Sequence, residues 1–203
     1  MSNGNDNLSL RLNRAESWLK KAENAEDEDT RFIALWIAFN AAYACDVGIV
    51  AGDKNHLRQF LTQIVALDEA HIIYDLIWQR FPKNIRVLLD NKYVFQPFWD
   101  FHNGKIQEKV WLEDFAAEKD KVKKALAQQD TDLVLFIIFD RIYTLHNQII
   151  HGGASFSSSV NRPQVRDCSE ILAIFVPLMI DIMKKNLQRD WGKPFYPLIK
   201  EQE

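Results

Sequence analysis

Long stretches without glycine or proline are the feature that most limits what this chain can fold into. The 203 residues include only 7 glycines and 6 prolines, and between them apolar residues recur at spacings of three and four. That period is typical of amphipathic helices, whereas a protein of many strands needs frequent turn residues. With 47% hydrophobic residues, the chain can form a sizeable core without disulfides or a metal ion. We therefore expect an all-α fold, a helical bundle that forms a single domain.

The pattern predicts a disordered N-terminus over residues 1–7, a helical domain over 8–190 and a tail over 191–203 that packs on the bundle. The segment 30–45 is apolar nearly all round, as a helix at the centre of a bundle would be. Pro163 suits the first turn of the last helix, and Pro177 should kink it. Helix N-caps are expected at Asp27, Asp53, Asp68 and Asp130. Helices are predicted over 8–25, 30–45, 53–66, 68–81, 106–128, 130–151 and 163–188.

The aromatic-rich segment 93–101 allows two interpretations. Its rings could stack nucleic-acid bases, but without neighbouring arginines they are more often part of a core. The charged run 118–124 is likewise more typical of a solvated helix face than of an RNA track.

Charge and cysteine content narrow the function classes. A formal net charge of -3 and a pI near 6.0 argue against non-specific binding of duplex DNA, which favours a basic protein. Cys45 and Cys168 lie far apart in apolar settings, so we expect both to be reduced and buried. The longest apolar run, Leu133–Phe139, is too short to span a membrane. A cytoplasmic protein without a membrane partner is expected.

The helix predicted over 130–151 carries the most informative residues. It begins apolar, turns polar in its last three turns and meets a stop at Gly152 and Gly153. Four polar residues share one face at about 100° per residue: Asp140, Thr144, Asn147 and His151. His146 points roughly 140° away from His151 on a straight helix. Such residues at a helix end suggest a functional site; alternatively, Asp140 and Arg141 form surface pairs and His151 hydrogen-bonds the last carbonyls.

Residues 142–153 read IYTLHNQIIHGG, and this stretch resembles the motif of HEPN domains. That motif has an Arg, usually followed by a polar residue, and a His after four to six intervening positions. The resemblance extends through FIALWIAFNAAY, NKYVFQPFW, ASFSSSVNRPQVRD and WGKPFYP, and so covers most of the chain. One departure matters, because His146 stands where the motif places its Arg, whereas Asn147 and His151 match. Arg141 and His146 form a second, weaker register, RIYTLH, without the polar residue after the Arg.

The resemblance implies a HEPN-type bundle and a metal-independent endoribonuclease in a prokaryotic defence or toxin–antitoxin setting. It also implies a two-fold homodimer, an RNA substrate, an antitoxin or defence-system partner and no cofactor. By that analogy His151 would move the proton, Asn147 would orient the phosphate or His151, and His146 would replace the phosphate-binding Arg. Three further residues are candidates for substrate binding: Asp140, Arg141 and Thr144.

His146 is expected to impair catalysis, because an imidazole is only partly charged at neutral pH and cannot bind a phosphate with two parallel donors. The residue is either a natural variant or a disabling substitution. Two alternatives stay open: a non-catalytic HEPN module that binds RNA, a nucleotide or a protein, and a purely structural dimerisation domain. Zinc bound by His146 and His151 is disfavoured, since helical zinc pairs prefer a spacing of four and no third ligand is evident.

Overall fold

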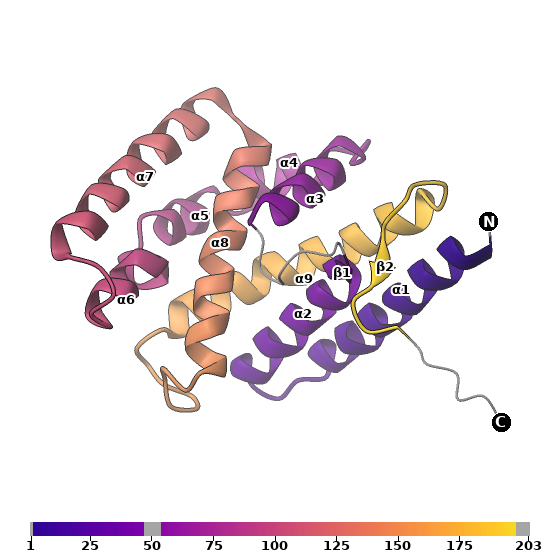
Figure 1. Cartoon of the computed structure of the whole chain (residues 1–203), viewed down its shortest axis with the longest axis horizontal. Coiled ribbons are helices and arrows are strands. Elements are labelled where there is room, and N and C mark those ends of the chain that lie inside the picture. The colour runs from indigo at the N-terminus through magenta and orange to yellow at the C-terminus, as the bar shows by residue number, and fades with distance from the viewer. Residues whose placement is uncertain (1, 47–53, 198–203) are drawn as a thin grey trace. The chain divides into compact units, whose positions relative to one another are not determined.

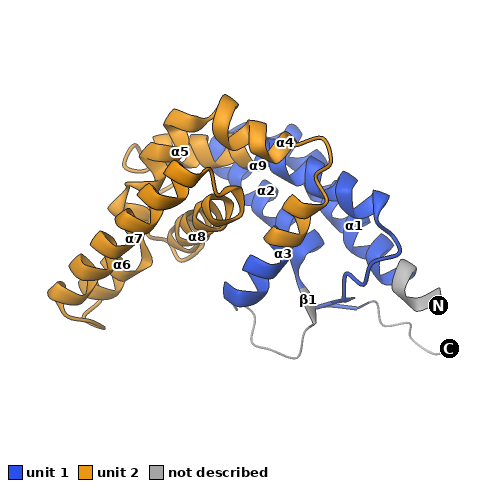
Figure 2. Cartoon of the chain, turned by 90° about the horizontal axis from the view of Figure 1, so that it is seen from above, with its two compact units in different colours: residues 1–60, 172–203 blue, residues 61–171 orange. Residues whose placement is uncertain are grey.

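The computed structural model describes residues 2–46 and 54–197 (Figure 1). Apart from two strands of two residues each, β1 (Cys45–Asp46) and β2 (Lys193–Pro194), the regular elements of these residues are helices. The predicted all-α class is thus confirmed. The chain divides into two compact units, where the sequence indicated one domain: residues 1–60 with 172–203, and residues 61–171 (Figure 2). The division falls within α3 (Lys54–Ala66) and within α9 (Arg162–Lys185). The N-cap predicted at Asp53 lies outside the described residues.

The first unit is organised around α1 (Ser2–Glu23) and α2 (Glu28–Tyr43), which pack against each other. Asp27 caps α2 as predicted, because its carboxylate accepts hydrogen bonds from the Thr30 amide at 2.8 Å and the Thr30 hydroxyl at 2.7 Å. Phe32, Leu35 and Phe39 of α2 are fully buried, as expected for a central helix. The helix α1 begins at Ser2, whereas the sequence pattern predicted a disordered segment over residues 1–7 and a helix from Leu8. Once a helix is nucleated, each added residue costs little, and polar residues can extend it.

Arg11 of α1 hydrogen-bonds to the C-terminal tail of this unit. Its side chain is 1% exposed, and it donates to the carbonyl oxygens of Trp191 and Ala42 and, at 3.1 Å, of Tyr43. Ala42 and Tyr43 are the last residues of α2, whose carbonyls have no partner within the helix. One guanidinium therefore satisfies the end of α2 and holds the tail beside it.

The tail folds back only in part as predicted. The Trp191 side chain is buried and its ring packs edge-on against Phe60, with the centroids 6.2 Å apart. The strand β2 pairs antiparallel with β1. Beyond it, Phe195 is 39% exposed and Tyr196 is 74% exposed, so the Tyr196 side chain does not pack as the predicted tail would.

The second unit begins within α3. Its next helix starts at Ile72 with His71 as the N-cap, so Asp68 is not the N-cap that the sequence predicted, although its carboxylate accepts from the Ile73 amide at 2.6 Å. This helix, α4 (Ile72–Asp75), continues into a π-helix, η1 (Leu76–Arg80). The π-helix ends just before Pro82, and Pro82 is the first residue of the next helix. Proline suits a first helical position because the amide hydrogen that it lacks would have no partner within the helix. The remaining elements are α5 (Pro82–Leu89), η2 (Lys92–Val94), α6 (Gln96–His102), α7 (Glu108–Gln128) and α8 (Thr131–Ile150).

The aromatic segment predicted to be core forms a small cluster of its own. Phe95, Phe98 and Trp111 are buried together, and partly buried apolar residues pack against them: Trp99, Phe101, Ile106 and Phe115. Tyr93 is the exception, since 53% of its side chain is exposed.

The helix α8 runs through the second unit and contacts α5, α7, η1 and η2. It starts at the predicted cap, where the Asp130 carboxylate accepts from the Leu133 amide at 3.0 Å. In the described part of the chain, α8 alone is long and apolar enough to cross a membrane, and half of its apolar window is buried within the protein. A core helix of a helical unit meets the same criterion, so this property alone does not indicate a membrane span.

Candidate functional site at the end of helix α8

Two glycines fix where α8 ends. The Gly153 amide donates to the Gln148 carbonyl at 2.6 Å, and the Gly152 amide donates to the Ile149 carbonyl at 3.1 Å. These two bonds define a Schellman motif, in which the residue after the cap takes a left-handed conformation; Gly152 has φ of 73°. A side chain at position 153 would approach the Gln148 carbonyl to 2.9 Å, so glycine is required there for space. His151 thus occupies the helix cap, and its side chain is exposed.

Asn147 lies one turn before His151, and His146 lies five residues before it; both are half-buried. The pKa of His146 is lowered, chiefly because burial penalises the charged imidazolium. A hydrogen bond with the Asn147 side chain raises that pKa, and the charge of His151 lowers it. The imidazole of His146 is therefore predominantly neutral at neutral pH. The three residues form one interacting set at the helix end, although His146 and His151 are not one turn apart.

Arg141 is placed differently from the sequence expectation. Its side chain is 0% exposed, with the guanidinium carbon 4.7 Å from the centre of the Phe95 ring and one nitrogen 3.8 Å from the Glu118 carboxylate. None of its three guanidinium nitrogens has a hydrogen-bond partner among the described residues. Burial lowers its pKa, while the charges of Glu118 and Asp140 raise it. An arginine enclosed in this way does not reach a substrate, so neither the substrate-binding role predicted for Arg141 nor the RIYTLH register fits its position.

Thr144 is also buried, at 2% exposed, and its hydroxyl donates to the backbone carbonyl of Asp140 at 3.1 Å. That bond is the usual arrangement for a threonine inside a helix. Asp140 is half-buried, three turns before the helix end. Of the four residues on the expected polar face, Asp140 and Thr144 thus lie along the body of the helix, and only Asn147 and His151 lie at its accessible end.

Tyr93 is a neighbour of this helix end that the sequence did not place there. Its carbonyl oxygen accepts from the Gln148 amide at 2.6 Å and from the Trp99 indole at 2.8 Å. Gln148 lies three residues before His151, and residues at that spacing are neighbours on one side of a helix. The exposed Tyr93 ring stands edge-on to Phe98, with the Lys92 ammonium 5.3 Å from its centre. The aromatic segment was recognisable in the sequence, but its contact with α8 is a tertiary feature.

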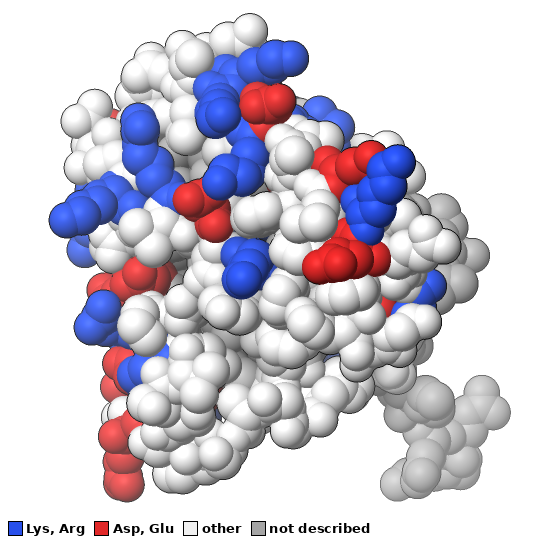
Figure 3. Space-filling model, turned by 90° about the vertical axis from the view of Figure 1, so that its left-hand side faces the viewer, with Lys and Arg blue, Asp and Glu red and all other residues white. Residues whose placement is uncertain are grey.

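Charge is mixed around the second unit. Lysines and arginines alternate with aspartates and glutamates on the face shown in Figure 3. Along α7, Lys119 pairs with Asp90 at 2.6 Å and Lys123 with Asp120 at 3.4 Å. The prediction of a solvated charged face rather than an RNA track is consistent with these pairs. Within residues 2–46 and 54–197, no group of three His, Cys, Asp or Glu side chains is arranged to hold a metal ion.

Comparisons of the chain with protein-family models, curated proteins and solved structures give no match. The resemblance to HEPN domains therefore rests on the residues of this chain alone.

Proposed function

We propose that the protein is a metal-independent endoribonuclease of HEPN type, weakened as it stands by His146, and that it works in the cytoplasm of a prokaryote in a defence or toxin–antitoxin setting. The observation that carries this proposal is the set of Asn147, His146 and His151 at an accessible helix end that is fixed by the Gly152–Gly153 stop. A histidine held at a rigid helix end can move a proton near neutral pH.

In the proposed reaction His151 takes the proton from a ribose 2′-hydroxyl, whose oxygen attacks the adjacent phosphorus. The phosphorus–O5′ bond breaks, so the products are a 2′,3′-cyclic phosphate and a free 5′-hydroxyl, the latter protonated by a histidine or by water. Asn147 supplies a neutral donor that orients the phosphate. No oxidant, metal or second substrate is needed for this step.

The proposed site lacks a fixed positive charge next to the phosphate. Negative charge develops on the phosphate oxygens in the transition state, and a fixed guanidinium stabilises it through two parallel donors. His146 cannot do this, because its pKa is lowered and it is predominantly neutral at neutral pH. The buried Arg141 does not replace it.

A homodimer is part of the proposal. Tyr143, Asn147 and Ile150 recur at spacings of four and three along α8 and so share one face. Tyr143 is 39% exposed and Ile150 is 51% exposed, and Phe156 in the following loop is 75% exposed. Large apolar side chains that are exposed together are typical of a surface that a partner covers. A second copy placed there would bring two sets of these polar residues together around one RNA strand.

Tyr93 and Lys92 supply a contact for the substrate. An exposed aromatic ring can stack a base, and a neighbouring ammonium can approach a phosphate. The Tyr93 carbonyl contacts Gln148, three residues before His151, so in this proposal the ring of Tyr93 would hold a base near the cleaved bond.

The neutral His146 also favours a second candidate, a non-catalytic module that binds RNA or a partner protein through the same surface. The two functions are separated by a cleavage assay on varied single-stranded RNAs with EDTA present. His146→Arg is expected to cleave about a hundredfold faster than the unaltered protein, and His146→Arg/His151→Ala is expected to be inactive.

A matched control is His71→Asn in the His146→Arg background. His71 is exposed, lies in a left-handed turn that asparagine tolerates, and is remote from α8 in sequence. It should leave the cleavage rate unchanged. If none of the folded variants cleaves any of the RNAs, the nuclease proposal is wrong; RNA binding without cleavage would favour the binding module.

A further inference from the structure

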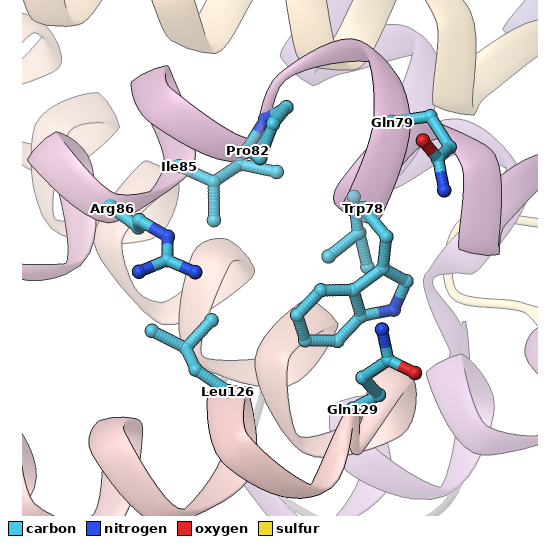
Figure 4. A pocket seen from close by; sticks show the side chains of 8 residues that line it. Trp78, Gln79, Pro82, Ile85, Arg86, Leu126 and Gln129 are labelled. Carbon is cyan, nitrogen blue, oxygen red and sulfur yellow. The ribbon is translucent and has the colours of Figure 1, made fainter.

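A pocket in the second unit lies away from the end of α8. It has a volume of about 180 Å³ and is lined by residues of η1, α5 and the end of α7. Ile77, Ile85 and Leu126 give it apolar walls, and Figure 4 shows the Arg86 guanidinium and the Trp78 indole on opposite sides of it. Trp78 contacts Thr131, the first residue of α8, so the pocket is about 30 Å along the helix from His151.

Arg86 is the charged group of the pocket. Its guanidinium makes no hydrogen bond or ion pair with any residue that the structure describes. Several lysines of the neighbouring α7 are paired with acids, as Lys119 is with Asp90 and Lys123 is with Asp120, whereas Arg86 has no such partner beside the apolar walls. A planar guanidinium with free donors matches a carboxylate or phosphate in a bidentate geometry.

The opposite wall is held in place by hydrogen bonds. The Trp78 indole donates to the Thr131 hydroxyl at 3.0 Å, which fixes the ring plane. The Gln129 side-chain oxygen accepts from the Tyr74 hydroxyl at 3.2 Å, which leaves its amide group as a donor at the rim. The aromatic face and the amide are therefore preorganised rather than free to rotate.

The backbone of the pocket departs from regular helix in two places. Trp78 and Ile77 lie in the π-helix η1, and Gln129 has a φ of 52°. Single turns of π-helix are rare and are frequent at functional sites, and a left-handed conformation is unfavourable for a residue other than glycine. Gln129 is the C-cap at which α7 ends, so its conformation belongs to the helix end, whereas the π-helix places Ile77 and Trp78 in the lining of the pocket.

We propose that this pocket binds a small planar organic anion, an aromatic carboxylate being the class that fits best. The carboxylate would pair with Arg86, and the ring would lie against Trp78 and Leu126. Sites for larger ligands usually measure about 300 Å³ or more, so a pocket of this volume is too small for a whole nucleotide. The site is independent of the function proposed for the end of α8.

The test is an NMR titration of the full chain that follows the Trp78 indole N–H signal, assigned with Trp78→Phe. Benzoate is the probe, benzamide has the same shape without the charge, and acetate has the charge without the ring. Benzoate is expected to shift the Trp78 signal in a saturable way at millimolar concentration, with benzamide and acetate each binding at least about tenfold more weakly.

Arg86→Gln removes the charge at an exposed position, so the fold is retained, and it should weaken benzoate about tenfold. Lys83→Gln is the matched control, because Lys83 is exposed on the same helix and does not line the pocket. The proposal is overturned if benzoate leaves the Trp78 signal unmoved, if benzamide binds equally well, or if Lys83→Gln weakens binding as much as Arg86→Gln.

Discussion

Replacing Arg141 with methionine is expected to leave the protein as stable as before or to stabilise it, although the residue forms an ion pair. The 3.8 Å separation from the Glu118 carboxylate gives an attraction of about 4 kcal/mol at an effective dielectric constant of about 20. Against this stands the transfer of a guanidinium from water to a fully buried position, which costs several kcal/mol even after relaxation. The direction in which burial lowers the Arg141 pKa reflects the same penalty.

Hydrogen bonds do not offset the desolvation cost of Arg141. The three guanidinium nitrogens have no acceptor among the described residues, and each buried polar group without a partner costs about 1–3 kcal/mol. Methionine has a similar length, removes the charge and retains packing against Phe95. Glu118 loses one partner but keeps its ion pair with Lys121 at 3.7 Å and is 18% exposed, so the substitution does not leave it as an unpaired buried charge. We therefore expect Arg141→Met to change the free energy of unfolding by between about 0 and +2 kcal/mol, in the stabilising direction.

The assay is urea unfolding at neutral pH, with thermal unfolding as a second readout. Arg141→Ala separates charge from volume, because it leaves a cavity and should destabilise by about 2–4 kcal/mol. Arg166→Met is the surface control, with a side chain that is 62% exposed, and should stay within about 0.5 kcal/mol of the unaltered protein. A loss of about 3 kcal/mol or more in Arg141→Met would refute the reasoning, since it would mean that the buried pair is a net source of stability.

Three further predictions concern the helix end and the thiol. Gly153→Ala should destabilise by about 1–3 kcal/mol in urea unfolding, since the new methyl would approach the Gln148 carbonyl to 2.9 Å, and an equal stability would contradict the Schellman geometry. Because the pKa of His146 is lowered in the folded protein, the unfolded chain binds more protons as the pH falls through about 6.5, and stability should decrease from about pH 7 to pH 5. That decrease should be smaller in His146→Gln, and equal slopes in the two proteins would argue against a buried neutral imidazole. Burial raises the pKa of the Cys168 thiol far above its usual range. In a Cys45→Ser background, a thiol reagent should therefore react with Cys168 only when the protein is unfolded. Rapid reaction with the native protein would show that Cys168 is accessible.

Local signals in the sequence determined the helices of this protein. The caps at Asp27 and Asp130 were predictable because each carboxylate accepts from an amide only three residues ahead in the chain. The stop at Gly152 and Gly153 was predictable for the same reason, since a left-handed turn is a local conformation. The apolar period of α8 likewise indicated a buried helix, without reference to what packs on it.

Spacing also placed Asn147 and His151 at an accessible helix end, but it did not give the environment of the residues before them. Arg141 appeared as a polar residue on an emerging face, yet α7 supplies Glu118 and the aromatic segment supplies Phe95, and together they enclose it. Periodicity describes one helix, whereas burial depends on the neighbours, which are far away in sequence. The π-helix η1 was missed as well, because the pattern distinguishes helix from strand but not one helical hydrogen-bond register from another.

Contacts between residues that are distant in the sequence depend on how the helices pack in three dimensions. Nothing in the sequence around Arg11 predicts that it hydrogen-bonds the end of α2 and the C-terminal tail. Its partners are the carbonyl oxygens of Ala42 and Trp191, which are distant in the sequence. Tyr93 was one aromatic residue among several until the Gln148 amide placed it beside the end of α8. The unpaired Arg86 became notable only when Trp78 and Leu126 were found around the same pocket. The physical reason is common to all three: local hydrogen bonds and side-chain period are set by neighbouring residues, whereas long-range contacts depend on how whole helices pack.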